Sequence, residues 1–328
     1  MTGGPAVFVE TAARLHFGVL DLRGDRGRWF GGIGAAAPSP TLLVSASPAP
    51  DLIVEGEDAD RAAAIARAFL AQHRLAGAAR VFVHRALPAH AGLGSGTQLA
   101  LAVGRALAEL HGIATTPAAL AMAVSRAQRS AIGTWTFAGG GLVVEGGRRP
   151  DRDGVGPLIA RLPFPPGWRC IVAVPRRPPS ISGADEAEAL ATLPPPPDRE
   201  VEHVAHLVLM ALLPAVADDD LDTFGRALTA IQTITGRWFA PVQGGAFAPG
   251  PGEELVRRMA EWGAAGVGQS SWGPAVYGIV DGAAAGAALA DRVRGALDRC
   301  GGGQVYEGPF RSEGARVWRG GSASSGSM

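Results

Sequence analysis

The stretch LPAHAGLGSGTQLALAVGRALAELHG, from Leu87 to Gly112, joins a glycine-rich turn to an amphipathic segment. Leucine and valine recur at helical spacing after the turn, which predicts a helix that begins near Ser95 to Thr97 and ends at Gly112. The segment ARVFVHRALP before the turn is a strand candidate. This order of elements gathers backbone N–H groups and the positive end of the helix dipole around one point, which suits a phosphate or pyrophosphate.

The residues of the turn fit close approach to an anion. Gly92, Gly94 and Gly96 permit positive φ, and Ser95 and Thr97 bring hydroxyls that can cap the helix. The turn is not a Walker loop, because the lysine of GxxxxGK[ST] is missing, and its GxGxG spacing is not the Rossmann fingerprint. The other interpretation is a tight strand-to-helix turn whose glycines serve packing alone.

Composition narrows the class of protein. With 328 residues, 47% of them hydrophobic, the chain is long enough for two modest domains or one large one. Arginine supplies all 30 basic residues, which balance 30 acidic ones, so we expect neither nucleic-acid binding nor a Schiff-base or P-loop lysine. Cys170 and Cys300 show no metal-ligand spacing, and no signal or membrane segment is evident. A cytoplasmic globular protein is expected.

The pattern along the chain predicts mixed strands and helices. VFVETAARLHFGVLDL, PTLLVSAS and DLIVEG read as strands, and helices are expected at residues 58–74, around 200–235 and in the two segments EELVRRMAEWG and AAAGAALADRVRGALDRCG. A polar Gly/Pro-containing connection suggests a boundary near residue 155. We therefore expect an N-terminal domain at 1–155, a C-terminal domain at 156–318 and a disordered tail at 319–328.

The glycine turn also carries a family resemblance. LPAHAGLGSGTQ is similar to the PxxxGLGSS motif of the GHMP kinase superfamily, whose members wrap this loop around nucleotide phosphates. With ARLHFGVLDL (residues 13–22), GGIGAA (31–36) and GVGQSSWGPAVYG (266–278), the chain resembles the β-ribofuranosylaminobenzene 5′-phosphate synthases, GHMP-like enzymes of methanopterin biosynthesis and one-carbon metabolism. SGADEAEAL (182–190) and the turn at Gln243 match the same family.

The resemblance implies an α+β fold in two parts, an N-terminal domain with a left-handed βαβ crossover and a C-terminal ferredoxin-like domain. It also implies a decarboxylating phosphoribosyltransferase. Phosphoribosyl pyrophosphate would react with 4-aminobenzoate or 4-hydroxybenzoate at the ring carbon that bears the carboxylate, giving a C-riboside phosphate, CO₂ and pyrophosphate. Mg²⁺ is expected with the pyrophosphate, and the enzyme is expected to be a homodimer.

The resemblance also assigns site residues. Arg14 and His16 would contact the pyrophosphate or the ribose phosphate, and Asp21 would bind a metal or a ribose hydroxyl. The loop that would cradle a phosphate comprises Gly92, Leu93, Gly94, Ser95, Gly96, Thr97 and, for an adjacent oxygen, Gln98.

The last expected site segment is the GVGQSSWGP turn. Gly268, Gln269, Ser270 and Ser271 would bring small and polar groups beside the loop, and Trp272 would flank an aromatic ring or else lie in the core. The three segments should therefore converge, with Ser95 and Ser270 within about 20 Å of each other, because one bound substrate must touch both.

Two other functions remain open at this point. A kinase of this fold would usually carry an aspartate after the loop helices, yet no acidic residue occurs between Arg126 and Glu145. A non-catalytic protein that binds a phosphorylated ligand is the second alternative.

Two other polar groups are not assigned to the site. The acidic run Asp218, Asp219 and Asp220 precedes a helical pattern and is interpreted as a helix cap. The pair His203 and His206 lacks a third metal ligand.

Overall fold

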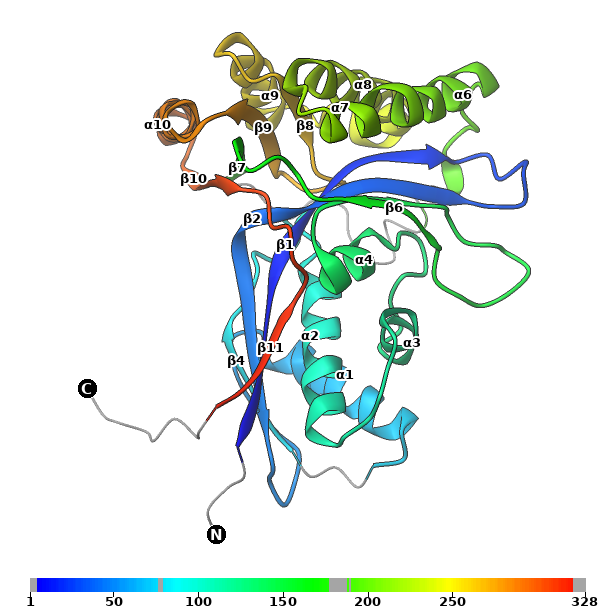
Figure 1. The fold of residues 1–328 in the computed structure, drawn as a ribbon, viewed down its shortest axis with the longest axis vertical. Coiled ribbons are helices and arrows are strands. Elements are labelled where there is room, and N and C mark those ends of the chain that lie inside the picture. The colour runs from blue at the N-terminus through cyan, green and yellow to red at the C-terminus, as the bar shows by residue number, and fades with distance from the viewer. Residues whose placement is uncertain (1–4, 76–78, 177–187, 189, 321–328) are drawn as a thin grey trace.

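The computed structural model describes residues 5–75, 79–176, 188 and 190–320. Two sheets with helical layers make up this part of the chain (Figure 1). The first has seven strands, in the order β11-β1-β2-β4-β3, with β5 beside β2 and β6 beside β5. The second has four, in the order β10-β7-β9-β8. The predicted mixture of strands and helices is confirmed.

Two long strands form the spine of the first sheet. β1 (Ala6–Asp21) and β2 (Phe30–Ser47) pair antiparallel over nearly their whole lengths. Alternate residues of β1 are buried, including Leu15 and Phe17. Since successive side chains of a strand point to opposite faces, Arg14 and His16 lie together on the other face.

The glycine turn connects this sheet to a buried helix. β3 (Ile53–Gly56), α1 (Ala59–Gln72) and β4 (Arg80–Arg85) form a parallel β–α–β unit where the resemblance implies the left-handed crossover. The next helix, α2 (Ser95–Leu110), buries most of its side chains against α1, β1 and β2. Its N-cap is Gly94 at φ 74° without a side-chain hydrogen bond, so the predicted capping by serine and threonine hydroxyls is wrong.

Several later elements return to the first sheet. α3 (Pro117–Ala123) and α4 (Ile132–Gly139) precede β5 (Leu142–Glu145), and the Thr116 hydroxyl caps α3 by accepting the N–H of Ala119 at 3.2 Å. Because β6 (Leu158–Leu162) pairs with β5, a division at residue 155 does not separate the two sheets.

The last strand also belongs to the first sheet. β11 (Arg316–Gly320) pairs antiparallel with the start of β1. Arg319 and Gly320, predicted as the beginning of a disordered tail, are therefore in a strand, and the other predicted tail residues, 321–328, lie outside the described residues.

The second sheet lies under a layer of helices (Figure 1). Its strand pairs are all antiparallel. Asp220 caps the longest helix, α8, by accepting the N–H of Thr223 at 2.9 Å, which confirms the capping interpretation for this acid. The elements are β7 (Trp168–Pro175), β8 (Gly266–Gln269), β9 (Val276–Asp281), β10 (Gly303–Pro309), α6 (Asp198–Leu207), the π-helical turn η1 (Val208–Leu212), α7 (Leu213–Ala217), α8 (Leu221–Gln243), α9 (Pro251–Glu261) and α10 (Ala283–Arg299).

One helical run in the described chain, Asp198–Ala217, has the length and mean hydropathy (1.5) of a membrane-crossing helix. It begins with charged residues, and its Glu200 accepts the indole N–H of Trp238 from α8 at 2.7 Å. Length and composition are the whole of this similarity, which core helices of soluble proteins share.

Candidate active site

The glycine loop, β1 and the turn between β8 and β9 meet at one serine. The Ser270 hydroxyl donates to the carbonyl of Gly92 at 2.7 Å and accepts the backbone N–H of His16 at 2.9 Å. Since Ser95 is only three residues beyond Gly92, the predicted convergence of the three segments is confirmed. Ser270 is fully buried, and its hydroxyl serves as the joint between these segments.

Close backbone contact at this joint requires glycine. Gly92 has φ +81°, and a Cβ there would lie 2.1 Å from the carbonyl oxygen of Ser270. On the opposite side, a Cβ on Gly273 would lie 2.1 Å from the carbonyl carbon of Ala91. Packing therefore accounts for part of the glycine pattern.

The same loop nevertheless presents an anion site at the start of α2. The carbonyl of Gly94 accepts the N–H groups of Thr97 and Gln98, whereas those of Ser95 and Gly96 have no acceptor among the described residues. A helix start with free N–H groups and the positive end of the helix dipole attracts anions.

Arginines surround this helix start, and we call Arg14, Arg61, Arg126 and Arg129 the arginine cluster. A Cβ on Gly96 would lie 2.9 Å from Nη2 of Arg61 and 3.7 Å from Nη2 of Arg126. Arg61 also pairs with Asp58 at 2.7 Å. Arg14 donates to the Gly92 carbonyl at 2.6 Å, which sets its guanidinium against the loop.

The Arg126 guanidinium is poorly compensated. Its Nε is buried without a hydrogen-bond partner among the described residues. Burial, and then the nearby charge of Arg61, lower the pKa of Arg126 from its ordinary value. An anion at the start of α2 would relieve both costs.

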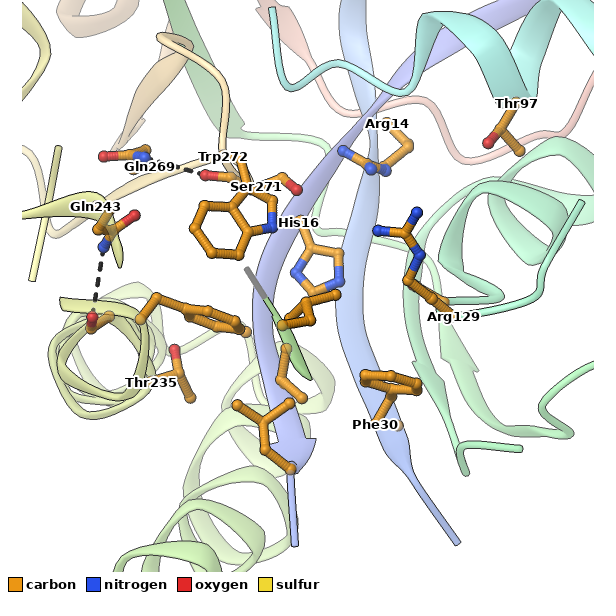
Figure 2. Close-up of a pocket in the computed structure, with 18 of the residues that line it drawn as sticks. Arg14, His16, Phe30, Thr97, Arg129, Thr235, Gln243, Gln269, Ser271 and Trp272 are labelled. Atoms are coloured by element: carbon orange, nitrogen blue, oxygen red, sulfur yellow. Dashed lines mark hydrogen bonds between the residues drawn. The ribbon is translucent and has the colours of Figure 1, made fainter. Parts of the chain in front are cut away.

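A cavity of about 300 Å³ opens from this cluster toward the second sheet. Figure 2 shows Arg14, His16 and Arg129 beside one another, with Thr97 at one end and Gln243 and Thr235 at the other. Every ionisable group among the described lining residues is an arginine or a histidine. The cavity therefore suits an anionic ligand.

The central histidine is neutral at physiological pH. Burial, and then the charge of Arg14, lower the pKa of His16 from 6.5 to about 3. The imidazole can thus hydrogen-bond a ligand without adding charge. Two register shifts in β1, between Ala12 and Arg14 and between His16 and Gly18, flank this pair, and such bulges commonly re-aim side chains near sites.

The free energy of unfolding should depend on the protonation of His16. Between pH 6.5 and about 3 the unfolded chain holds a proton on His16 that the folded chain does not, so stability rises with pH through this window and is complete above it. Relative to His16→Gln, we expect the wild type to lose about 2 kcal/mol between about pH 7.5 and about pH 5. Denaturant titrations of both proteins at the two pH values measure the difference, and parallel curves would contradict it.

Aromatic side chains also line the cavity. Trp272 lines the cavity and packs edge-on against Phe239 of α8, with ring centroids 5.1 Å apart. Phe30 lines it from β2. The alternative that Trp272 is a core residue is wrong, because its ring is only half-buried and faces the cavity (Figure 2). A flat aromatic ligand fits between such walls.

Known proteins resemble this chain in both halves. The model described as GHMP kinases N terminal domain matches residues 60–140, and that described as GHMP kinases C terminal matches residues 212–299. Two relatives are each named beta-ribofuranosylphenol 5′-phosphate synthase. That of Methanothermobacter thermautotrophicus is 35% identical over 84% of this chain and 89% of its own. That of Archaeoglobus fulgidus is 36% identical over 85% of this chain and 89% of its own.

The chain belongs to this synthase family. The resemblance to GHMP-like synthases is thereby confirmed, although these relatives are named for the phenol and not for the aminobenzene. Solved structures agree on the fold. Homoserine kinase from Cytophaga hutchinsonii superposes with a TM-score of 0.71 at 16% identity, covering 95% of this chain and 97% of its own. Mevalonate pyrophosphate decarboxylase from Streptococcus pyogenes superposes with a TM-score of 0.68 at 15% identity, covering 95% of this chain and 98% of its own.

Two residues that the synthase resemblance placed at the ligand are used within the protein. Gln98 is fully buried, accepts the hydroxyl of Thr11 at 2.8 Å and donates to the carbonyl of Gly133 at 3.0 Å. Gln269 accepts the N–H of Ala248 at 2.8 Å and donates to the carbonyl of Ser271 at 3.0 Å, although it lines the cavity. Both amides therefore position the site's backbone.

The remaining predicted residues divide between cavity and scaffold. Thr97 and Ser271 line the cavity, whereas Leu93 is buried in the core. Gly268 lies in β8, where a Cβ would be 2.4 Å from the Tyr277 hydroxyl. Most of SGADEAEAL (residues 182–190) lies outside the described residues, although Leu190 lines the cavity.

Asp21 is the last residue of β1, next to Leu22, which lines the cavity. Its Oδ1 accepts the N–H groups of Arg23 at 2.6 Å and Gly24 at 3.4 Å, and it is not among the lining residues. Within the described ranges no group of three or more His, Cys, Asp or Glu side chains could hold a metal ion. The chain's own described residues therefore do not fit a resident Mg²⁺, and the metal role of Asp21 stays a prediction.

Sequence reasoning missed the segment SRAQRS, from Ser125 to Ser130, which contributes Arg126 and Arg129 to the cavity. Glu145 holds the end of this segment: its buried carboxylate accepts the N–H of Ala131 at 3.2 Å and of Gly147 at 2.7 Å. Burial raises the pKa of Glu145, and the two hydrogen bonds oppose that effect. The available signal was a pair of arginines just after a short helix in a chain without lysine.

Proposed function

We propose that this protein is a decarboxylating phosphoribosyltransferase that condenses phosphoribosyl pyrophosphate with 4-hydroxybenzoate or 4-aminobenzoate. The products are a β-ribofuranosyl-arene 5′-phosphate, CO₂ and pyrophosphate. The single observation that carries the proposal is a cavity lined by arginines and aromatic side chains, with no carboxylate among its described lining residues. The relatives' printed name supports the same reaction and favours the phenol, hence 4-hydroxybenzoate.

The bond changes of this reaction match what the cavity offers. The C1′–O bond breaks and its electron pair leaves with pyrophosphate. The ring carbon that bears the carboxylate then forms a bond to C1′, and loss of CO₂ returns electrons to the ring. No proton needs to be removed by the protein, so a cavity without a carboxylate base suffices. A kinase usually positions an acid to orient or deprotonate its acceptor.

The arginine cluster and the start of α2 would stabilise the departing pyrophosphate. Preorganised positive groups act most strongly where charge develops and water is excluded. Neutral His16 would lie near the developing positive charge of the ribose without repelling it, because its pKa of about 3 keeps it unprotonated. Trp272 and Phe30 would align the arene ring for attack.

Mg²⁺ enters this proposal as part of the substrate. The described residues offer no ligand cluster for it, whereas the phosphate oxygens of phosphoribosyl pyrophosphate are ligands that Mg²⁺ prefers. We infer that the metal arrives chelated by the donor.

We also propose that the enzyme acts as a cytoplasmic homodimer in methanopterin biosynthesis. Cys170 and Cys300 are free thiols, in keeping with a reducing compartment. Leu209 and Met210 of η1 are strongly exposed and offer an apolar contact surface for a second copy. Analytical ultracentrifugation measures the mass of the particle in solution, and a monomer at micromolar concentration would contradict the dimer.

Release of ¹⁴CO₂ from carboxyl-labelled acids tests the reaction. Purified protein with Mg²⁺ and phosphoribosyl pyrophosphate should release label from 4-hydroxybenzoate, 4-aminobenzoate or both, and ATP in place of the donor should give none. Absence of release from folded protein with both acids would overturn the proposal. ATP-dependent phosphorylation of a sugar or alcohol would then favour the kinase alternative.

A further inference from the structure

The side-chain amide of Gln243 has a fixed orientation at the end of the cavity. Gln243 is the last residue of α8, and its Nε2 lies 2.8 Å from the carbonyl oxygen of Gly245, 3.0 Å from that of Ala246 and 3.3 Å from that of Gly236. An amide oxygen in this place would face three acceptors, so the nitrogen must occupy it. The Oε1 atom consequently faces the other way.

That oxygen has no hydrogen-bond donor among the described residues, although Gln243 lines the cavity (Figure 2). The two other glutamines nearby differ: Oε1 of Gln232 accepts the N–H of Gln269 at 2.8 Å, and Oε1 of Gln269 accepts the N–H of Ala248 at 2.8 Å. Gln243 therefore holds an oriented acceptor toward the space a ligand would fill.

The neighbouring polar group has the same character. The hydroxyl of Thr235 donates to the carbonyl of Ile231 at 2.9 Å, so toward the cavity it can only accept. Two acceptors at one end repel a carboxylate and attract a donor. Arg14 and Arg129 of the arginine cluster, which suit the anionic groups, lie on the far side of His16 from Gln243 (Figure 2).

We propose that Gln243 Oε1 accepts the hydrogen of the acceptor's para substituent and thereby selects 4-hydroxy- or 4-aminobenzoate over acids without a donor at that position. The inference rests on the proposed function. The ring attacks through its carboxylate-bearing carbon, which must face the ribose near the arginine cluster. The para group then points away from the cluster, toward Gln243.

The reaction strengthens this hydrogen bond. As the new bond to C1′ forms, positive charge spreads through the ring to the para oxygen or nitrogen, which becomes a stronger donor. A fixed carbonyl oxygen therefore stabilises the transition state more than the bound substrate. Loss of Gln243 should lower kcat as well as the affinity for the acid.

Calorimetric titration with 4-hydroxybenzoate and 4-fluorobenzoate, in the presence of pyrophosphate, tests the contact without depending on turnover. Fluorine is close to a hydroxyl in size but has no hydrogen to donate. We expect the wild type to bind the hydroxy acid about 10-fold more tightly, and Gln243→Met to reduce this preference to about 2-fold. In the ¹⁴CO₂ assay, kcat of the variant should fall about 10-fold while the KM for phosphoribosyl pyrophosphate stays within about 2-fold.

Equal binding of the two acids by the wild type, or no binding of either, would overturn the inference, as would an undiminished preference in the variant. The wild-type comparison holds even where Gln243→Met loosens the turn at residues 244–246. Failure of the proposed function has a different signature, because the wild type would then release no CO₂ from 4-hydroxybenzoate or from 4-aminobenzoate.

Discussion

Replacing Gly92 with alanine is expected to abolish turnover and to lower the free energy of unfolding by about 3 kcal/mol or more. The added Cβ would lie 2.1 Å from the Ser270 carbonyl oxygen and 3.0 Å from the Gly273 Cα, both backbone atoms, at a φ of +81°. The segments joined by Ser270 would have to separate, and the glycine loop would leave the cavity. Denaturant unfolding and the ¹⁴CO₂ assay measure the two effects.

Gly112→Ala is the matched control. Gly112 follows the other end of α2 at φ +67°, and a Cβ there meets nothing within 4 Å. This variant has the same backbone strain without the overlap, so it should lose about 1 to 2 kcal/mol and keep its activity. Equal losses in the two variants would show that conformational strain, and not the contact with the β8–β9 turn, determines the effect at Gly92.

Replacing Arg126 with methionine should reduce kcat/KM for phosphoribosyl pyrophosphate about 100-fold without loss of stability. The reason is that Arg126 is half-buried near Arg61 and its buried Nε has no hydrogen-bond partner among the described residues, so its charge costs the free protein and favours the bound anion. Stability should stay equal or rise. Calorimetry with inorganic pyrophosphate should show weaker binding by the variant.

Arg67→Met removes an equivalent charge from an exposed position on α1 and should leave kcat/KM and pyrophosphate binding unchanged. An Arg126→Met protein with full affinity for pyrophosphate would mean that the anion lies elsewhere. A marked loss of stability would instead show that Arg126 is compensated in the folded protein.

The sequence allowed the glycine loop and its helix to be predicted because strand, turn and helix are local patterns. Gly94, however, takes the N-cap position without a side-chain bond, since a left-handed residue at the cap leaves the N–H groups of Ser95 and Gly96 available. Local propensity favours a serine or threonine cap here. Anion binding instead favours a cap without a side-chain acceptor, because the N–H groups then remain available to the ligand.

Long-range pairings could not be predicted from local patterns. Gln98 followed the loop and suggested a ligand contact, yet its amide joins Thr11 to Gly133 across residues far apart in sequence. Arg126 and Arg129 lie in an irregular segment without periodicity, and only the fold brings them to the start of α2. β6 and β11 likewise join the first sheet through partners that no neighbouring residue specifies.

The pairing of β11 with β1 has a consequence for biosynthesis. Residues 316–320 complete the sheet edge at Ala6–Glu10, so this edge of β1 stays open on the ribosome until residues 316–320 have emerged. An open strand edge can pair with other chains. Nascent polypeptide should therefore need protection until β11 has been made, and truncation before Arg316 should cause aggregation of newly made protein.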